Sequence, residues 1–219
     1  MNQQLGNAKG LVGVTITGLT SVSNLLSTAR NTLVTLADGN TTGAQRTEAI
    51  QSYKQTLVSI KSAIQDSGYN GKTLIGNITG SAGTFAKATL IRNDQGSTYG
   101  VATFGGSAFF GSLSFTATQL GGAATVAGLI TTGGVLLKKV DQLGQQLNSY
   151  GAASNFIDNQ TTFNSNKIDS LNSGLGSLID ADLTKEAARL QSLQIKQQLG
   201  TQALSIANQA PSSLLSLFK

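Results

Sequence analysis

The sequence predicts a mainly α-helical protein with a small β insert, in which long antiparallel coiled-coil helices bracket an outer β-containing domain. Three observations predict this fold class. Apolar residues recur at alternating spacings of three and four near both ends of the 219 residues. The middle of the chain is uncharged and rich in Gly, Ser and Thr. Charged residues make up only 11% of the chain, against about 25% in ordinary soluble domains, while 39% hydrophobic residues permit a buried core.

Residues 1–76 are expected to form a helical hairpin of a coiled-coil layer. Alternating spacings of three and four place apolar residues on one stripe of a helix, which then needs a partner along that seam. Asp38-Gly39-Asn40 is expected to end the first helix and Asp66-Ser67-Gly68 the second. The seam residues predicted for the two helices are Leu19, Val22, Leu26, Ala29, Leu33 and Leu36 in the first, and Ile50, Tyr53, Leu57, Ile60 and Ile64 in the second.

Residues 77–134 are expected to form a variable, outward-facing insert that contains β-structure. No charged residue occurs between Gln95 and Leu137, a stretch of 43 residues. Alternating apolar and β-branched residues with Gly punctuation predict short strands and turns, for example over residues 83–91 and 112–118. The most apolar window, residues 121–137, has five Gly and falls short of the ~20 apolar residues of a membrane span. It is predicted to be a glycine-rich strand or loop.

Residues 135–180 are expected to form the C-terminal coiled-coil helix. Their polar positions in the same register, Ser154, Thr161 and Asn164, either fix the register or only weaken the seam, and the sequence leaves both readings open. The predicted seam residues are Leu136, Val140, Leu143, Leu147, Tyr150, Ile157, Ile168, Leu171, Leu175 and Leu178.

Residues 181–219 are expected to form a further helix whose apolar residues do not keep to one stripe. A helix that is apolar nearly all round must be buried on several sides. One chain of this size has no matching segment to supply all those neighbours, so the helix is expected to pack against other subunits.

The composition excludes most enzymatic chemistry. With no His and no Cys, the chain cannot provide an ordinary zinc site, a histidine base, a thiolate nucleophile or a disulfide, so we expect no enzyme, no metal and no cofactor. The net charge of +5 comes from scattered residues, and Lys138-Lys139 is the only adjacent basic pair, so nucleic-acid binding is not expected. The polar N-terminus carries no signal-peptide pattern.

Four short stretches near the C-terminus resemble the end of bacterial flagellin. They are Asp180-Ala181-Asp182, Leu199-Gly200-Thr201-Gln202-Ala203-Leu204, Ala207-Asn208-Gln209-Ala210-Pro211 and Leu214-Leu215-Ser216-Leu217-Phe218-Lys219. Tyr69-Asn70-Gly71-Lys72-Thr73-Leu74-Ile75 is similar to the family's Asn-Gly element that closes the N-terminal hairpin. The strings LGTQAL and SLFK suggest the alphaproteobacterial branch.

The resemblance implies a structural subunit of the flagellar filament that self-assembles through its terminal helices for motility. It also implies other flagellin subunits, the flagellar export apparatus, a secretion chaperone and the filament cap as partners, with an extracellular location reached without a cleavable signal peptide and without a membrane span. Residues 181–219 would be the filament-core helix. Its expected assembly residues are Leu190, Leu193, Leu199, Leu204, Ile206, Asn208, Gln209, Leu214, Leu215, Leu217 and Phe218.

One departure from the family concerns the N-terminus. Flagellins usually begin with some fifty more residues, a helix that pairs with the C-terminal one, and most of that helix is missing here. The chain by itself is therefore expected to polymerise poorly. Two other readings remain open, a hook–filament junction protein and a flagellin-like cell-surface adhesin or binding protein, although Asn208-Gln209-Ala210-Pro211 favours a filament flagellin.

Overall fold

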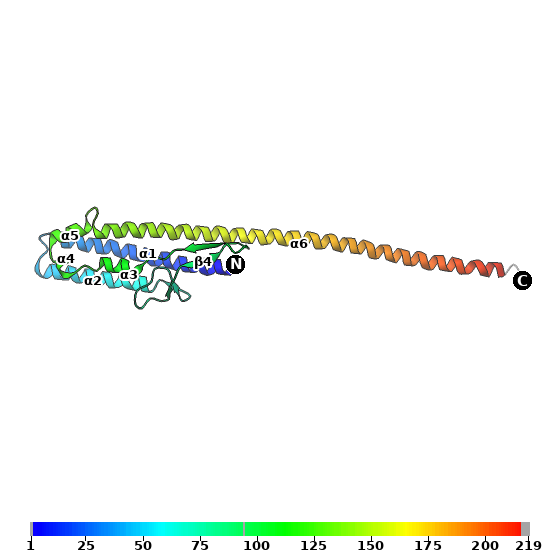
Figure 1. Ribbon diagram of the computed structural model, residues 1–219, viewed down its shortest axis with the longest axis horizontal. Coiled ribbons are helices and arrows are strands. Elements are labelled where there is room, and N and C mark those ends of the chain that lie inside the picture. The colour runs from blue at the N-terminus through cyan, green and yellow to red at the C-terminus, as the bar shows by residue number, and fades with distance from the viewer. Residues whose placement is uncertain (1, 94, 216–219) are drawn as a thin grey trace. The chain divides into compact units, whose positions relative to one another are not determined.

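The computed structural model describes residues 2–93 and 95–215, which fall into two units, residues up to 163 and residues from 164 on. Figure 1 labels most of the elements. In chain order they are α1 (Asn2–Ala37), α2 (Gly43–Gln65), β1 (Gly68–Tyr69), β2 (Lys72–Thr73), β3 (Thr84–Phe85), β4 (Ala88–Ile91), β5 (Thr98–Val101), α3 (Gly106–Leu113), α4 (Ala117–Gly121), α5 (Ala123–Ile130) and α6 (Val135–Leu215). The predicted fold class, mainly helical with a small β insert, is confirmed.

The heptad of α1 begins earlier than the sequence analysis proposed. Ten buried positions continue the alternating spacings of three and four from the start of the helix, because Ala8 and Thr15 occupy positions where the sequence shows no large apolar residue. The buried Thr15 hydroxyl donates to the Leu11 carbonyl at 2.7 Å, so it can lie in the seam without an unmade hydrogen bond. The ten positions are Leu5, Ala8, Val12, Thr15, Leu19, Val22, Leu26, Ala29, Leu33 and Leu36.

The ends of the hairpin helices lie where the turn signals indicated. α1 ends at Ala37, and the Asp38 Oδ1 atom then accepts a hydrogen bond from the Asn40 backbone N–H at 2.9 Å. Such a local bond lets the backbone turn instead of continuing the helix. α2 ends at Gln65, immediately before the predicted Asp66-Ser67-Gly68 stop.

Two small sheets follow the hairpin. β1 pairs with β2 in antiparallel fashion through a turn in which Asn70 and Gly71 have φ values of 49° and 72°, the left-handed pair that a tight hairpin requires. β3 adds to β2 in parallel, with Lys72 opposite Thr84. β4 and β5 form a separate antiparallel pair. The strands predicted over residues 83–91 are therefore confirmed as β3 and β4.

The strands predicted near residues 112–118 are wrong, and the strand or loop predicted for residues 121–137 is limited to Gly122 and the loop of residues 131–134. Both stretches contribute to α3, α4, α5 and the start of α6. A capping box starts α4, since the Thr116 N–H donates to Gln119 Oε1 at 2.9 Å and the Gln119 N–H donates to Thr116 Oγ1 at 3.3 Å. Burial of Phe109, Leu113 and Val126 in the core outweighs the strand preference of Thr and the helix penalty of Gly.

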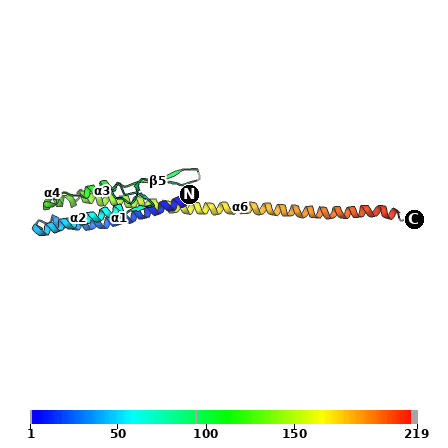
Figure 2. The same cartoon turned by 90° about the horizontal axis from the view of Figure 1, so that it is seen from below.

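The first part of α6, residues 135–163, completes the core of the first unit. Leu136, Leu143, Tyr150 and Ile157 are buried at intervals of seven residues, which keeps them on one narrow row of the helix. Figures 1 and 2 show this part of α6 running beside α1. Near its end the Lys9 Nζ atom lies 2.6 Å from Asp158 Oδ1, which ties α1 to α6 at an exposed position.

Candidate assembly surface

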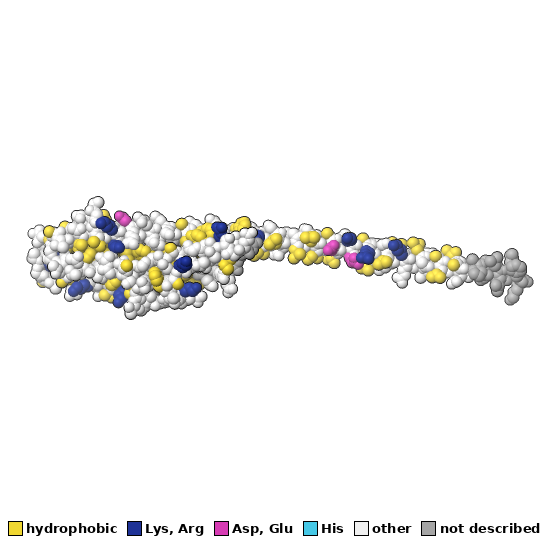
Figure 3. Space-filling model, in the orientation of Figure 1, with side chains coloured by type: hydrophobic (Ala, Val, Ile, Leu, Met, Phe, Trp, Pro, Cys, Tyr) yellow, Lys and Arg dark blue, Asp and Glu magenta, His cyan; other side chains and the backbone are white. Residues whose placement is uncertain are grey.

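The side chains of residues 165–208 in α6 are all exposed, including twelve large apolar ones. Their exposed fractions lie between 49% and 69%, and Figure 3 shows hydrophobic side chains over this part of the helix. Contiguous exposed apolar surface of this length marks an interaction site in a soluble protein. The residues are Ile168, Leu171, Leu175, Leu178, Ile179, Leu183, Leu190, Leu193, Ile195, Leu199, Leu204 and Ile206. We call the exposed face of residues 165–208 the assembly surface.

The apolar residues of the assembly surface move from one face of the helix to a neighbouring face after Leu178. The three-and-four spacing of the buried seam is apolar up to Leu178, and its next positions are the charged residues Asp182, Lys185 and Arg189. Over the same turns Ile179 and Leu183 begin a neighbouring row that Ala187 and Leu190 continue. Because residues three and four apart share a face, a change of row widens the apolar area around the helix. One partner helix cannot cover it, so several neighbours are needed.

The ion pair between Arg189 and Glu186 contributes little to the assembly surface. The Arg189 Nη1 atom and the Glu186 Oε2 atom are 3.9 Å apart, and both side chains are more than 60% exposed. An exposed ion pair of this kind contributes roughly 0–1 kcal/mol. Binding through this surface is therefore expected to come from apolar burial.

The predicted coiled-coil residues have three different environments. Ile50 and Leu147 are half-buried against the core, and Val140 is 36% exposed because α6 buries mainly the row of Leu136 and Leu143. Ile168, Leu171, Leu175 and Leu178 are 49–69% exposed, so a seam through them needs a partner from another chain. The remaining residues are buried: Leu19, Val22, Leu26, Ala29, Leu33, Leu36, Tyr53, Leu57, Ile60, Ile64, Leu136, Leu143, Tyr150 and Ile157.

The predicted filament-assembly residues lie on the assembly surface or beyond it. Leu190, Leu193, Leu199, Leu204 and Ile206 are 54–66% exposed, and Asn208 is exposed as well. The structure does not describe the side chains of Gln209, Leu214 and Leu215, and Leu217 and Phe218 lie outside the described residues. The role of all these residues in assembly stays a prediction.

Polar anchors that the sequence analysis missed hold the insert against the helices. The Tyr53 hydroxyl donates to the Leu113 carbonyl at 2.7 Å, and the Tyr150 hydroxyl lies 3.1 Å from the Ala102 carbonyl. Burial raises the pKa of both tyrosines well above the ordinary value of about 10, although hydrogen bonds to Tyr150 partly oppose this. Both side chains are therefore neutral hydrogen-bond donors at physiological pH.

A third anchor, Arg46, closes the end of the hairpin. Its Nη2 atom donates to the Leu36 carbonyl at 2.7 Å, its Nε atom to Thr41 at 2.8 Å, and its Nη1 atom to Leu120 at 2.8 Å. The planar guanidinium can reach these carbonyls of α1, the turn and α4 at once, which a lysine could not. No sequence pattern indicates this contact, because Leu120 is 74 positions away.

Two helical stretches of the described residues, Asn2–Ala37 and Ala123–Asn208, are long and apolar enough to cross a membrane by length and composition alone. Buried core helices of soluble proteins share this length and composition. In α1 most of the large apolar residues are buried in the core of the first unit.

Comparisons with known proteins agree on one family. A family model described as the bacterial flagellin C-terminal helical region matches residues 134–218. Flagellin FljM of Caulobacter vibrioides is 33% identical over 223 residues, which cover 100% of this chain and 77% of that protein. A flagellin of Brucella melitensis is 56% identical over 69 residues, covering 32% of this chain and 24% of that protein.

Solved structures agree on the fold. Bacillus cereus flagellin has a TM-score of 0.62 at 17% identity, covering 74% of this chain and 88% of that one. A flagellar hook-associated protein from Vibrio parahaemolyticus has a TM-score of 0.57 at 18% identity, covering 75% of this chain and 84% of that one. At these identities the likeness concerns the fold alone.

The buried heptads, the small β insert and the exposed apolar helix together define a structural subunit made to join other subunits. Because the full-length similarity to the Caulobacter vibrioides flagellin covers most of both proteins, the chain belongs to the flagellin family. It is a structural subunit of the bacterial flagellar filament, an extracellular polymer of flagellin subunits. The predicted resemblance and function are confirmed.

Proposed function

We propose that the assembly surface is the part of this chain through which it joins the filament, as the filament-core helix predicted for residues 181–219. One observation carries the proposal: twelve large apolar side chains are exposed between residues 165 and 208, while residues 2–163 bury their own apolar rows. Burial of apolar area is the main favourable contribution to association, at about 25 cal/mol per Å². Neighbouring subunits that cover this surface would therefore hold the chain in the polymer.

The other partners of the chain follow from its place in a filament. We propose that it reaches the filament through the flagellar export apparatus, with a secretion chaperone and the filament cap, and without a cleavable signal peptide. The absence of Cys from the sequence supports this route, because export of an unfolded chain would involve no disulfide. Assembled, the subunit would serve motility.

We also propose that the chain has no enzymatic role, binds no nucleic acid and spans no membrane. A sequence without His or Cys lacks the commonest catalytic bases, nucleophiles and zinc ligands. The basic residues are scattered singly along the chain, apart from Lys138-Lys139. A protein that binds the phosphate backbone usually concentrates its basic residues on one face.

Sedimentation and negative-stain electron microscopy test the proposed surface. The purified chain is examined by itself and mixed with a full-length flagellin from the same source. Leu199→Glu should abolish entry into filaments, because it places a charge where apolar burial is required. Gln198→Glu adds the same charge at the neighbouring position and is the matched control, expected to assemble nearly as well as the unaltered chain.

Two outcomes would contradict the proposal. The first is an unaltered chain that stays monomeric in both experiments. The second is equal assembly of the Leu199→Glu and Gln198→Glu variants, since apolar burial at residue 199 would then be irrelevant.

A further inference from the structure

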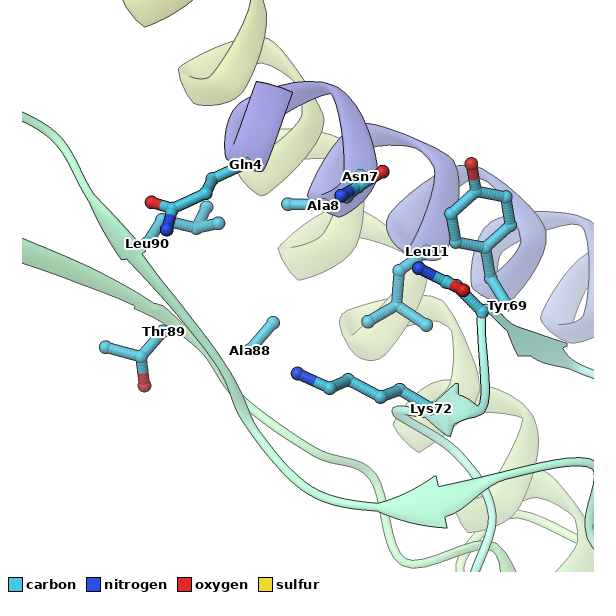
Figure 4. Close-up of a pocket in the computed structure, with 10 residues that line it drawn as sticks. Gln4, Asn7, Ala8, Leu11, Tyr69, Lys72, Ala88, Thr89 and Leu90 are labelled. Carbon is cyan, nitrogen blue, oxygen red and sulfur yellow. The ribbon is translucent and has the colours of Figure 1, made fainter. Parts of the chain in front are cut away.

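The first unit contains a small pocket. It has a volume of about 220 Å³ and opens between the first turns of α1, the β1–β2 hairpin and β4 (Figure 4). Buried side chains line it on one side, among them Ala8, Leu11 and Leu90. Exposed polar side chains, including Gln4 and Lys72, line the opening. The volume lies below the roughly 300–1,000 Å³ of small-molecule sites, so one or two side chains of a protein partner fit better.

Lys72 gives the pocket its charge. It is the only charged residue among those lining the pocket, and no carboxylate is among them. Figure 4 shows its ammonium group directed from β2 toward Ala88 of β4, across the opening. Among the described residues, the Lys72 side chain makes no hydrogen bond or ion pair, whereas the side chain of Lys9 in the same unit is paired with Asp158. The pocket thus joins apolar walls to one unpaired positive charge.

One segment of the chain has the complementary chemistry. Residues 178–183 read Leu-Ile-Asp-Ala-Asp-Leu, and no Lys or Arg occurs between Lys167 and Lys185. Leu178, Ile179 and Leu183 are 69%, 50% and 64% exposed, next to the carboxylates of Asp180 and Asp182. The exposed Val140-Asp141 and Ile168-Asp169 pairs are less suitable, because each offers one carboxylate beside one apolar residue, whereas residues 178–183 offer two carboxylates beside three.

We propose that the pocket receives residues 178–183 of a second copy of this chain. An apolar side chain, Ile179 or Leu183, enters between α1 and β4, and Asp180 or Asp182 pairs with Lys72. The proposal rests on the proposed self-association of the chain, and it assigns a specific contact to part of the assembly surface. Because the pocket and the segment are different surfaces of the same chain, the contact is heterologous and repeats from copy to copy, as an open helical polymer requires.

Carbodiimide crosslinking, which joins a lysine amine to a carboxylate without a spacer, tests the contact directly. Equal amounts of ¹⁴N-labelled and ¹⁵N-labelled chain are mixed and crosslinked in filaments and, in parallel, as concentrated chain without filaments. We expect mass spectrometry to find Lys72 joined to Asp180 or Asp182 in mixed-isotope peptides. No such peptide in either sample, or one that always carries a single isotope, would overturn the proposal.

Charge reversal tests the same contact quantitatively. Lys72→Glu should raise the chain concentration needed for association about three- to tenfold, the size of a coupling between neighbouring charges, and Asp182→Lys should do the same. The double variant should recover most of the loss, because it restores opposite charges. Lys87→Glu is the matched control, because Lys87 is an exposed lysine of the same unit that does not line the pocket.

The outcomes separate this contact from the assembly surface as a whole. If Lys72→Glu associates like the unaltered chain while Leu199→Glu does not, the pocket contact is wrong and the assembly surface stands. If Lys72→Glu and Lys87→Glu weaken association equally, only net charge matters and the contact is again wrong. If the double variant recovers no association, the proposed pairing of Lys72 with Asp182 fails.

Discussion

Residues 135–163 and residues 165–208 belong to the same helix, α6, and carry apolar residues at similar spacings, yet their environments are opposite. The first stretch buries Leu136, Leu143 and Ile157 in the core of the first unit, while the second exposes all of its Leu and Ile residues. The difference teaches that apolar periodicity marks a surface to be buried without saying which chain buries it. Within one chain it builds a core, and between chains it builds a polymer.

Deletion of residues 164–219 gives the sharpest test of this comparison. The remaining residues 1–163 contain all the buried apolar residues of the core, so we expect them to fold and stay monomeric. They should lose entry into filaments completely, because the assembly surface is gone. Circular dichroism melting and analytical ultracentrifugation check the two expectations. A deleted chain that unfolds would show that the second stretch also stabilises the core.

Single leucine substitutions should separate residues that stabilise the fold from residues that serve assembly. Leu33 is fully buried in α1, so Leu33→Ala should lower the free energy of unfolding by about 2–5 kcal/mol through lost burial and a cavity. Leu190 is 56% exposed, so Leu190→Ala should change it by less than about 0.5 kcal/mol. Urea denaturation of the monomer measures both values. A stability loss of equal size at the two positions would refute the comparison.

The same contrast explains how far the sequence predicted the molecule. The seams of α1 and α2 were predicted because large apolar residues at heptad spacing have only one way to be buried together. The start of α1 was missed because Ala8 and Thr15 are seam residues that no hydropathy pattern distinguishes. The helices α3, α4 and α5 were missed because their Gly and Thr residues favour turns and strands until burial in the core decides otherwise.

The polar anchors could not be predicted from the sequence, whereas the assembly residues could be proposed from it. Tyr53 bonds a carbonyl 60 positions away and Arg46 one 74 positions away, and backbone acceptors leave no trace in residue types. The assembly residues were placed by family resemblance together with an apolar distribution too broad for one partner. The structure adds their exposure, which a sequence pattern alone cannot give, because a core helix and a filament helix have similar composition.

Arg46 tests whether polar anchors support the buried region. Arg46→Met should lower the free energy of unfolding by about 1.5–3 kcal/mol, because the carbonyls of Leu36, Thr41 and Leu120 lose a charged donor. Arg46→Lys should recover only part of the loss, since an ammonium cannot span three acceptors. Thermal and urea melting measure the stability. Equal stability of the Lys variant and the unaltered chain would show that charge alone matters at this position.

Alkaline pH should weaken the buried region and leave the exposed one unaffected. Burial raises the pKa of Tyr53 and Tyr150 in the folded chain, whereas in the unfolded chain both titrate near the ordinary value of about 10. A raised folded pKa means that the stability is fully present below pH 10 and is lost above it, as the unfolded chain releases protons that the folded chain keeps. Ionisation of each tyrosine should then lower the free energy of unfolding by about 1 kcal/mol per pH unit above pH 10.

Urea melts between pH 8 and 11 measure this decline in stability. The decline should be smaller in the Tyr53→Phe/Tyr150→Phe double variant, which lacks both of these hydroxyls. An unchanged pH slope in that variant would show that the alkaline loss arises outside the tyrosine anchors.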